Sequence, residues 1–454
     1  KRSTVHSKSL VDLIVNFVIL DLQPPSIVTS DGFRHLVSHL SPTCALPTEQ
    51  SIIQEVVPKM YDALKNAMYN DITAINMTDN VFSLGLEHWE ANGREYISYY
   101  INYLQNEEKF TTRLLHTFLL DPDSVYDVFY HQEMFNIVCT SWNIKTSNIK
   151  AIVLATDNEA LHQVVANQEI PVLPCLNHTL SQMSLQAFEI PVIKDIIRKG
   201  RIIISQIYNK NNFAIEVAFQ ESQTEDETLS TFLSLDNPHV WLSTLNMLEA
   251  LNAARSKLNV LLEVGESSLN DSMSEEEWVI LARLVDIFNP IKVTVTTLSE
   301  EKPARASLIL PLYLQLVNYH LKITPHDDQI SVQLKTDFVN FLTKKYVSVD
   351  SFLQVCTALD PRVKKLPYIE QHNVFGGPIT AMLLAVEPPI TETTKYYTDV
   401  VEPETKKTAR RSGMEFLLGN VTSSPSPPVK SSLPSHADNI AHEISLYSRS
   451  TPAS

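Results

Sequence analysis

The stretch Ala151-Ile152-Val153-Leu154-Ala155 decides the fold class, because an unbroken apolar run of this length predicts a strand buried on both faces. Before it, Asp121-Pro122-Asp123-Ser124 offers capping residues for a helix that we expect to run to about Ile144. Still earlier, β-branched and aromatic residues predict three strands, at Ile72–Asp79, Tyr96–Leu104 and Phe110–Leu120. The predicted order of elements is therefore β-β-β-α-β.

Two acidic residues stand at the ends of predicted strands. Asp79 ends the first strand, and Asp157 follows the fourth. The order β-β-β-α-β with acids at these places predicts an RNase H-like core, in which the first and fourth strands are neighbours. The two carboxylates would then lie close together in space.

Helices are predicted on both sides of this core. Apolar residues recur at helical spacing over 10–21, 31–40, 48–68, 176–188, 192–208, 241–262, 274–298, 306–321 and 332–345. In the second of these helices, Phe33, Leu36, Val37 and Leu40 form the predicted buried face, and Ser274 with Glu277 predicts a capping box in the seventh.

The expected fold class is α/β, an RNase H-like core with a large all-α insertion, N-terminal helices and a disordered C-terminal tail. We expect an N-terminal helical segment over 1–69, the core over 70–235, the insertion over 236–370 and a flexible, proline-rich tail over 371–454.

Composition excludes several classes of protein. The formal net charge of −16 argues against strong general DNA binding by this chain, because such binding needs basic groups that neutralise phosphates. Only 9 glycines occur, and no glycine-rich phosphate-binding motif can be assembled from them. The 4 cysteines never form a Cys-x-x-Cys pair, which indicates reduced thiols rather than a disulfide framework. Neither a signal peptide nor a membrane span is predicted.

Several short sequence motifs occur in a fixed order along the chain. They are Asp21–Val28, Thr156-Asp157-Asn158, Cys175-Leu176-Asn177-His178, Val240-Trp241-Leu242-Ser243-Thr244 and Ala358-Leu359-Asp360-Pro361-Arg362-Val363-Lys364. Together they resemble the hAT superfamily of transposases and the host proteins derived from it, particularly the BED-type zinc-finger, ZBED-like group. The resemblance covers roughly residues 10–370.

The resemblance implies a catalytic site of two Asp and one Glu that binds Mg²⁺ or Mn²⁺. Asp79 and Asp157 stand where the first two acids should be. The third acid lies in the family's C-terminal dimerisation region, of which Glu443-Ile444-Ser445-Leu446-Tyr447 resembles only the first positions. We therefore expect a remnant acidic pair with at most residual binding of Mg²⁺ or Mn²⁺, and no catalytic residue. The structural alternative makes Asp79 a strand-end carboxylate and Asp157 a helix N-cap.

Other motif residues were weighed in the same way. Trp241 would contact DNA or pack between domains, whereas Val240 and Leu242 replace the Arg and Asn that are usual in the family. Cys175 and His178 supply only two of the four ligands of a structural zinc site, so we expect core residues there. Zinc would be held only by a BED finger, which the resemblance places before residue 1, outside this chain. The cluster Lys406-Lys407-Thr408-Ala409-Arg410-Arg411 could be a nuclear import signal.

These observations predict a domesticated, catalytically inactive nuclear protein, not an enzyme, that serves DNA-associated transcriptional regulation or a chromatin scaffold. The chain opens at Lys1, so we expect it to be part of a longer product that contacts DNA through missing regions and forms a homodimer. Neither a membrane nor a small-molecule substrate is expected as a partner. The alternatives are a fragment of an active metal-dependent DNA transposase of the DDE type, and a decaying element without selected function.

Overall fold

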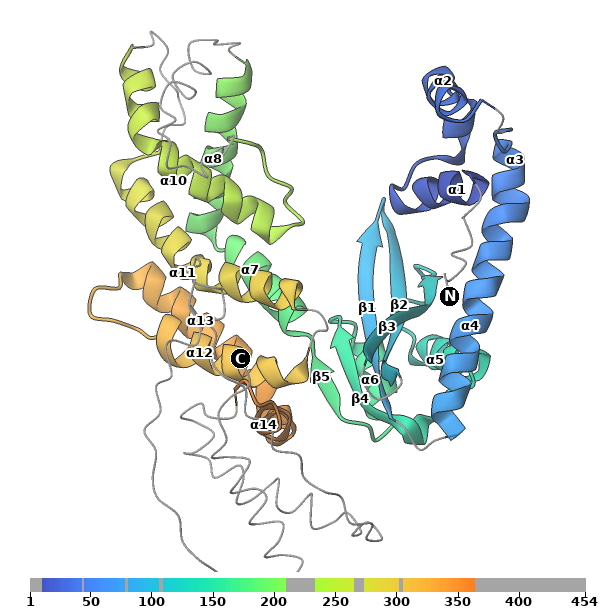
Figure 1. The fold of residues 1–454 in the computed structure, drawn as a ribbon. Coiled ribbons are helices and arrows are strands. Elements are labelled where there is room, and N and C mark those ends of the chain that lie inside the picture. The colour runs from blue at the N-terminus through green and yellow to red at the C-terminus, as the bar shows by residue number, and fades with distance from the viewer. Residues whose placement is uncertain are drawn as a thin grey trace, which may run out of the picture. The chain divides into compact units, whose positions relative to one another are not determined.

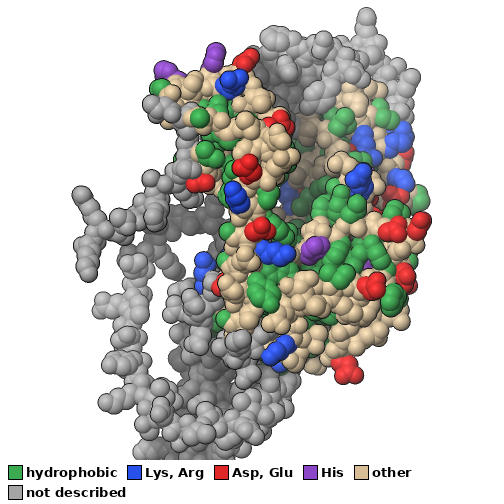
Figure 2. All heavy atoms as spheres, turned by 90° about the vertical axis from the view of Figure 1, so that its right-hand side faces the viewer, with side chains coloured by type: hydrophobic (Ala, Val, Ile, Leu, Met, Phe, Trp, Pro, Cys, Tyr) green, Lys and Arg blue, Asp and Glu red, His purple; other side chains and the backbone are tan. Residues whose placement is uncertain are grey.

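The computed structural model describes residues 10–42, 45–77, 81–105, 109–209, 233–264, 273–301 and 305–363 (Figure 1). The chain divides into two compact units. Unit 1 comprises 1–85, 89–151 and 158–170, and unit 2 comprises 86–88, 152–157 and 171–454. None of the described helices combines the length and the apolar character that a bilayer span requires. On the face shown in Figure 2, basic side chains are interspersed with acidic and hydrophobic ones.

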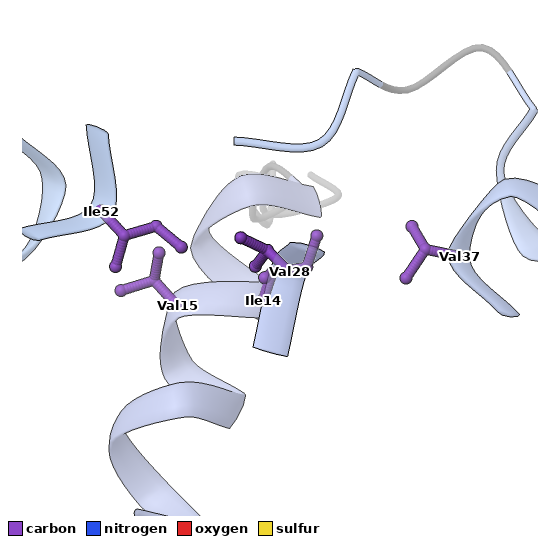
Figure 3. Packing of buried hydrophobic residues seen from close by; sticks show 5 residues of the cluster. All are labelled: Ile14, Val15, Val28, Val37 and Ile52. Carbon is purple, nitrogen blue, oxygen red and sulfur yellow. The ribbon is translucent and has the colours of Figure 1, made fainter. Parts of the chain in front are cut away.

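Unit 1 begins with helices that enclose a small apolar core. They are α1 (Leu10–Leu20), the short turn η1 (Pro25–Thr29), α2 (Asp31–Leu40), α3 (Glu49–Ser51), η2 (Ile52–Val56) and α4 (Val57–Met77). Ile14, Val15, Val28, Val37 and Ile52 form the buried cluster among the first of these elements (Figure 3). Four separate segments therefore stabilise one another through side-chain burial.

Helix α2 buries less than its sequence predicted. Val37 is buried, but Leu36 and Leu40 are 57% and 74% exposed. The apolar face is narrower than expected because α2 packs mainly through Val37 and Phe33, whose ring stacks on that of Phe17 with centroids 5.7 Å apart.

A mixed sheet of five strands follows, and its strand order is β3-β2-β1-β4-β5. The strands are β1 (Phe82–Ala91), β2 (Arg94–Gln105), β3 (Lys109–Leu119), β4 (Ile149–Ala155) and β5 (Val172–Pro174). Strands β2 and β3 are antiparallel, whereas β4 and β5 are parallel. Helix α5 (Val128–Ser141) precedes β4, so the predicted order β-β-β-α-β is confirmed.

The predicted first strand, Ile72–Asp79, is wrong. Residues up to Met77 belong to α4, and the first strand starts only at Phe82. Met68, Ile72 and Ile75 are buried at spacings of i, i+4 and i+7, which makes them the packed face of a helix. The β-branched residues that favoured a strand are thus explained by tertiary packing.

Strand β1 was not among the predicted strands, and the turn that joins it to β2 is the local feature that indicates it. Asn92 and Gly93 have φ angles of 52° and 70°, both in the left-handed region. A two-residue hairpin turn of this kind matches the twist of its strands, and Asn-Gly is its preferred sequence. Phe82, Leu84 and Leu86 alternate with less buried residues along β1, as a half-buried strand requires.

Unit 2 is mainly helical. Its helices are α7 (Leu176–Phe188), α8 (Pro191–Asn209), α10 (Trp241–Val264), α11 (Glu275–Glu300), α12 (Ile309–Gln315), α13 (Gln329–Tyr346) and α14 (Asp350–Ala358), while α6 (Glu159–Ala166) lies in unit 1. The predicted capping box is confirmed, because the side chains of Ser274 and Glu277 each accept the other residue's backbone N–H. The domain boundaries expected from the sequence stay predictions.

Helices α8 and α10 approach closely at Gly200. A Cβ atom built on this buried glycine would lie 2.8 Å from Cδ1 of Leu251. Real Cβ atoms do not come so near another atom, so only glycine permits this spacing without a shift of the neighbour. The side chain of Leu251 fills the space that the missing Cβ leaves.

Candidate functional site

Asp157 is the predicted site residue that the structure describes most fully, and it lies two residues after Ala155, the end of β4. Its Oδ1 lies 3.1 Å from Nζ of Lys345, near the end of α13, and its Oδ2 lies 3.4 Å from Nε2 of His178 in the first turn of α7. Both carboxylate oxygens therefore face nitrogen atoms from two helices. All three side chains belong to unit 2.

Electrostatics in this cluster favour the charged carboxylate. Burial on its own would raise the pKa of Asp157, but hydrogen bonds from His178 and Lys345, together with their charges, lower it from 3.8 to about 2. The side chain is still 41% exposed. A carboxylate of this kind is an ionised partner of two bases and is unsuited to donate a proton near neutral pH.

The other predicted acid, Asp79, lies outside the described residues. The sequence places it between α4 and β1, so it cannot end the first strand, which begins at Phe82. Its role as a metal ligand stays a prediction.

The structural alternative for Asp157 is wrong in one respect. The N-cap of α6 is Asn158, whose Oδ1 accepts a hydrogen bond from the backbone N–H of Leu161 at 3.1 Å. Asn158 is 6% exposed, and its amide group donates to the carbonyl oxygen of Val125 at 2.7 Å. Asp157 is thereby left to its side-chain partners in unit 2, and capping does not explain it.

The start of α7 lies beside this carboxylate. Burial raises the pKa of the Cys175 thiol, and backbone hydrogen bonds from His178 and Asn177 only partly offset this effect. Thr179 donates its hydroxyl to the carbonyl oxygen of Cys175 at 2.8 Å, which fixes the first turn. Among the described residues, no three His, Cys, Asp or Glu side chains are grouped so that they could hold a metal ion. Cys175 and His178 are thus not part of a complete metal-ligand set within that part of the chain.

Trp241, the predicted contact to DNA or between domains, is only 3% exposed. Its indole N–H donates to Oγ of Ser181 at 3.0 Å, and its ring lies 6.3 Å from that of Phe288, centroid to centroid. The structure therefore places Trp241 in the interior of unit 2. The contact with DNA or between domains stays a prediction.

Asp236, just before Trp241, forms a buried ion pair that the sequence did not reveal. Arg201 donates to it through Nε and Nη2, each at 2.7 Å, and Thr244 donates its hydroxyl at 2.6 Å. The Asp236 side chain is 1% exposed. Burial raises the pKa of this carboxyl group, but these hydrogen bonds outweigh burial and lower it.

Two comparisons with known proteins bear on this unit. Residues 173–287 match the family model described as the ZBED1 RNase-like helical domain. Over 375 residues, 80% of the chain, the sequence is 22% identical to human zinc finger BED domain-containing protein 4. Both matches support the resemblance of this chain to ZBED-like, hAT-derived proteins. The chain spans 31% of the length of that relative. The activities of the whole relative are therefore not assigned to this chain.

The segment around Asp360, which also carries the resemblance, forms internal bonds. Asp360 accepts hydrogen bonds from the hydroxyl of Ser307 at 2.7 Å and from the side chain of Arg362, which also reaches Glu301. Asp360 is 6% exposed. The motif therefore joins the segment after α14 to the end of α11 and to the short turn before α12, as a structural connection.

Sequence reasoning missed three residues near the end of β4, namely Glu87, His88 and Lys345. His88 on β1 lies 3.5 Å from the hydroxyl of Thr156, between Nδ1 and Oγ1. Burial is the main cause of the raised pKa of Cys175, and the charge of Glu87 adds to it. The turn Asn92-Gly93 was the signal that would have placed β1, and with it Glu87 and His88, beside β4. Lys345 carried no such signal.

Proposed function

We propose that this chain is the RNase H-like core and helical insertion of a domesticated, catalytically inactive, hAT-derived nuclear protein that serves DNA-associated transcriptional regulation or a chromatin scaffold. The family relationship and the confirmed order β-β-β-α-β support this proposal. The strand order, in which β1 lies next to β4, is what an RNase H-like core requires.

The observation that carries the loss of catalysis is the pairing of Asp157. Two-metal phosphoryl transfer needs carboxylates whose oxygens are open to the ions. In this chain, the oxygens of Asp157 face Lys345 and His178, at 3.1 and 3.4 Å. Asp157, paired in this way, does not fit a catalytic metal.

The charge distribution supports contact with DNA through other regions. The net charge of −16, and the acidic side chains interspersed with basic ones in Figure 2, do not favour a phosphate-binding stripe. We propose that a BED finger outside these residues binds zinc and reads DNA, and that the full-length product forms a homodimer. The relative's name includes such a finger.

The loss of catalysis is tested by incubating the purified chain with supercoiled plasmid in Mn²⁺ or Mg²⁺ and measuring nicked and linear products. We expect no cleavage by the chain or by its Asp157→Asn variant. Cleavage that disappears in Asp157→Asn would refute the proposal and would support the alternative, a fragment of an active transposase.

The nuclear role is tested on the full-length product in cells. A tagged copy should sediment with chromatin and be released by salt, because phosphate contacts weaken as ionic strength rises. Recovery in the cytosolic fraction alone would contradict this part of the proposal.

A further inference from the structure

Lys345 occupies the place beside Asp157 where a cation would be expected in a metal-dependent relative. Its Nζ lies 3.1 Å from Oδ1 of Asp157, and His178 faces the other oxygen at 3.4 Å. The two donors come from helices α13 and α7, so the strand end, α7 and α13 meet at this carboxylate. A metal ion would have to displace at least one of them to reach an oxygen atom.

An ammonium group so near the carboxylate also opposes a divalent cation by charge. Mg²⁺ and Mn²⁺ bind carboxylate oxygens directly, at about 2 Å, and need several oxygen ligands. The positive charge of Lys345 would remain within a few ångströms of such an ion, where like charges repel strongly. Its ammonium already neutralises the carboxylate, so Asp157 has little net charge left to offer.

The position of Lys345 is fixed by its neighbour in the sequence. Tyr346 is 1% exposed, and its hydroxyl donates to the carbonyl oxygen of Pro174 at 3.3 Å. The same hydroxyl lies 3.4 Å from Oγ1 of Thr179, and the ring lies 5.3 Å from that of Tyr313. The end of α13 is thereby held against β5 and against α7, the helix that carries His178. This anchoring holds the ammonium at the strand end.

We propose that Lys345 is a built-in cation that takes the place of a divalent metal at Asp157 and closes this carboxylate to metal ions. The inference rests on the proposed loss of catalysis and gives it a cause in a single side chain. It makes Lys345 a positioning residue that ties α13 to the end of β4. Removing its charge should therefore open the carboxylate to a cation.

The experiment is a titration of Mn²⁺ into the purified full chain, followed by calorimetry and by the electron paramagnetic resonance signal of free Mn²⁺. The variants are Lys345→Met, Lys345→Gln, and Lys345→Met combined with Asp157→Asn. Lys344→Met is the matched control, because it removes the same charge from an exposed neighbouring position. Circular dichroism confirms that each protein is folded, and Lys345→Gln replaces Lys345→Met if the latter fails to fold.

We expect Lys345→Met to bind Mn²⁺ roughly tenfold or more tightly than Lys344→Met, from the removal of one nearby like charge. That gain should vanish when Asp157→Asn is added. Equal, weak binding by both lysine variants would overturn the inference while leaving the proposed function intact. Tight binding by the unmodified chain, lost in Asp157→Asn, would overturn the inference, and plasmid cleavage would then decide the proposed function separately.

Discussion

Asp236 and Asp157 both pair with basic side chains in unit 2, yet they differ in burial and in the number of bonds. The Asp236 side chain is 1% exposed and accepts two bonds from Arg201 and one from Thr244. The Asp157 side chain is 41% exposed and faces Lys345 and His178 at longer distances. A buried, bidentate pair fixes one geometry, whereas a half-exposed pair is held less strongly. Asp236 therefore serves structure, and Asp157 is the carboxylate whose partner can be changed.

The largest effect should come from Arg201→Ala. It leaves a buried carboxylate without its cation and should lower the free energy of unfolding by about 3 kcal/mol, the lower end of the range for broken buried pairs, because Arg201 is itself partly exposed. Urea unfolding measures this loss. Arg198→Ala is the control, since Arg198 pairs with Asp195 on the surface of the same helix, where a much smaller loss is expected. Equal losses in the two variants would show that the Arg201–Asp236 pair stabilises the fold no more than a surface ion pair does.

A smaller loss is expected from Thr244→Val, which keeps the shape but removes one donor to Asp236. Hydrogen bonds to charged groups contribute about 1.5–3 kcal/mol, so we expect a loss near the lower value while Arg201 remains. Thr296→Val serves for comparison, because this exposed hydroxyl donates to the carbonyl oxygen of Lys292 in its own helix. A loss for Thr244→Val no greater than that for Thr296→Val would contradict the role given to the buried bond.

The smallest effect should come from Asp157→Asn, with a loss below about 1 kcal/mol near pH 7, because the pair is half-exposed. The pKa of Asp157 is lowered from 3.8 to about 2, so its contribution is present above the higher value and lost as pH falls toward the lower one. The stability difference between the native chain and Asp157→Asn should therefore shrink between about pH 5 and about pH 2.

Thermal unfolding across that pH range measures the difference for Asp157→Asn. Asp337→Asn makes the same charge change at an exposed position of α13 and reports the general effect of net charge. A difference that stays constant through this range would argue that Lys345 and His178 do not favour the ionised form of Asp157.

Local patterns predicted most of the helices and the order of the strands, because the spacing of apolar residues within a short stretch indicates which face is buried. Helix 176–188 and the strand around Ile152 needed nothing else. The first strand failed because Ile72 and Ile75 satisfy both a β-rich composition and a helical face, and only packing decides between them. The turn Asn92-Gly93 indicates the position of the true first strand, because it joins β1 to β2.

The candidate site was less predictable. Asp157 could be found because it lies two residues after a buried strand, a local feature. Lys345 could not, because it is 188 residues away in the sequence and reaches the site only through the packing of α13. Asp236 likewise depends on Arg201, 35 residues earlier on another helix. A single sequence carries no local signal for partners that folding brings together.

The close approach at Gly200 couples the folding of α8 to that of α10 in unit 2. Glycine inside a helix is less favourable than alanine by about 1 kcal/mol, so α8 is weakest at the point where Leu251 of α10 covers it. We expect α8 to become a stable helix only when α10 packs against it. Amide hydrogens around Gly200 and Leu251 should then gain protection together during refolding, as one cooperative unit.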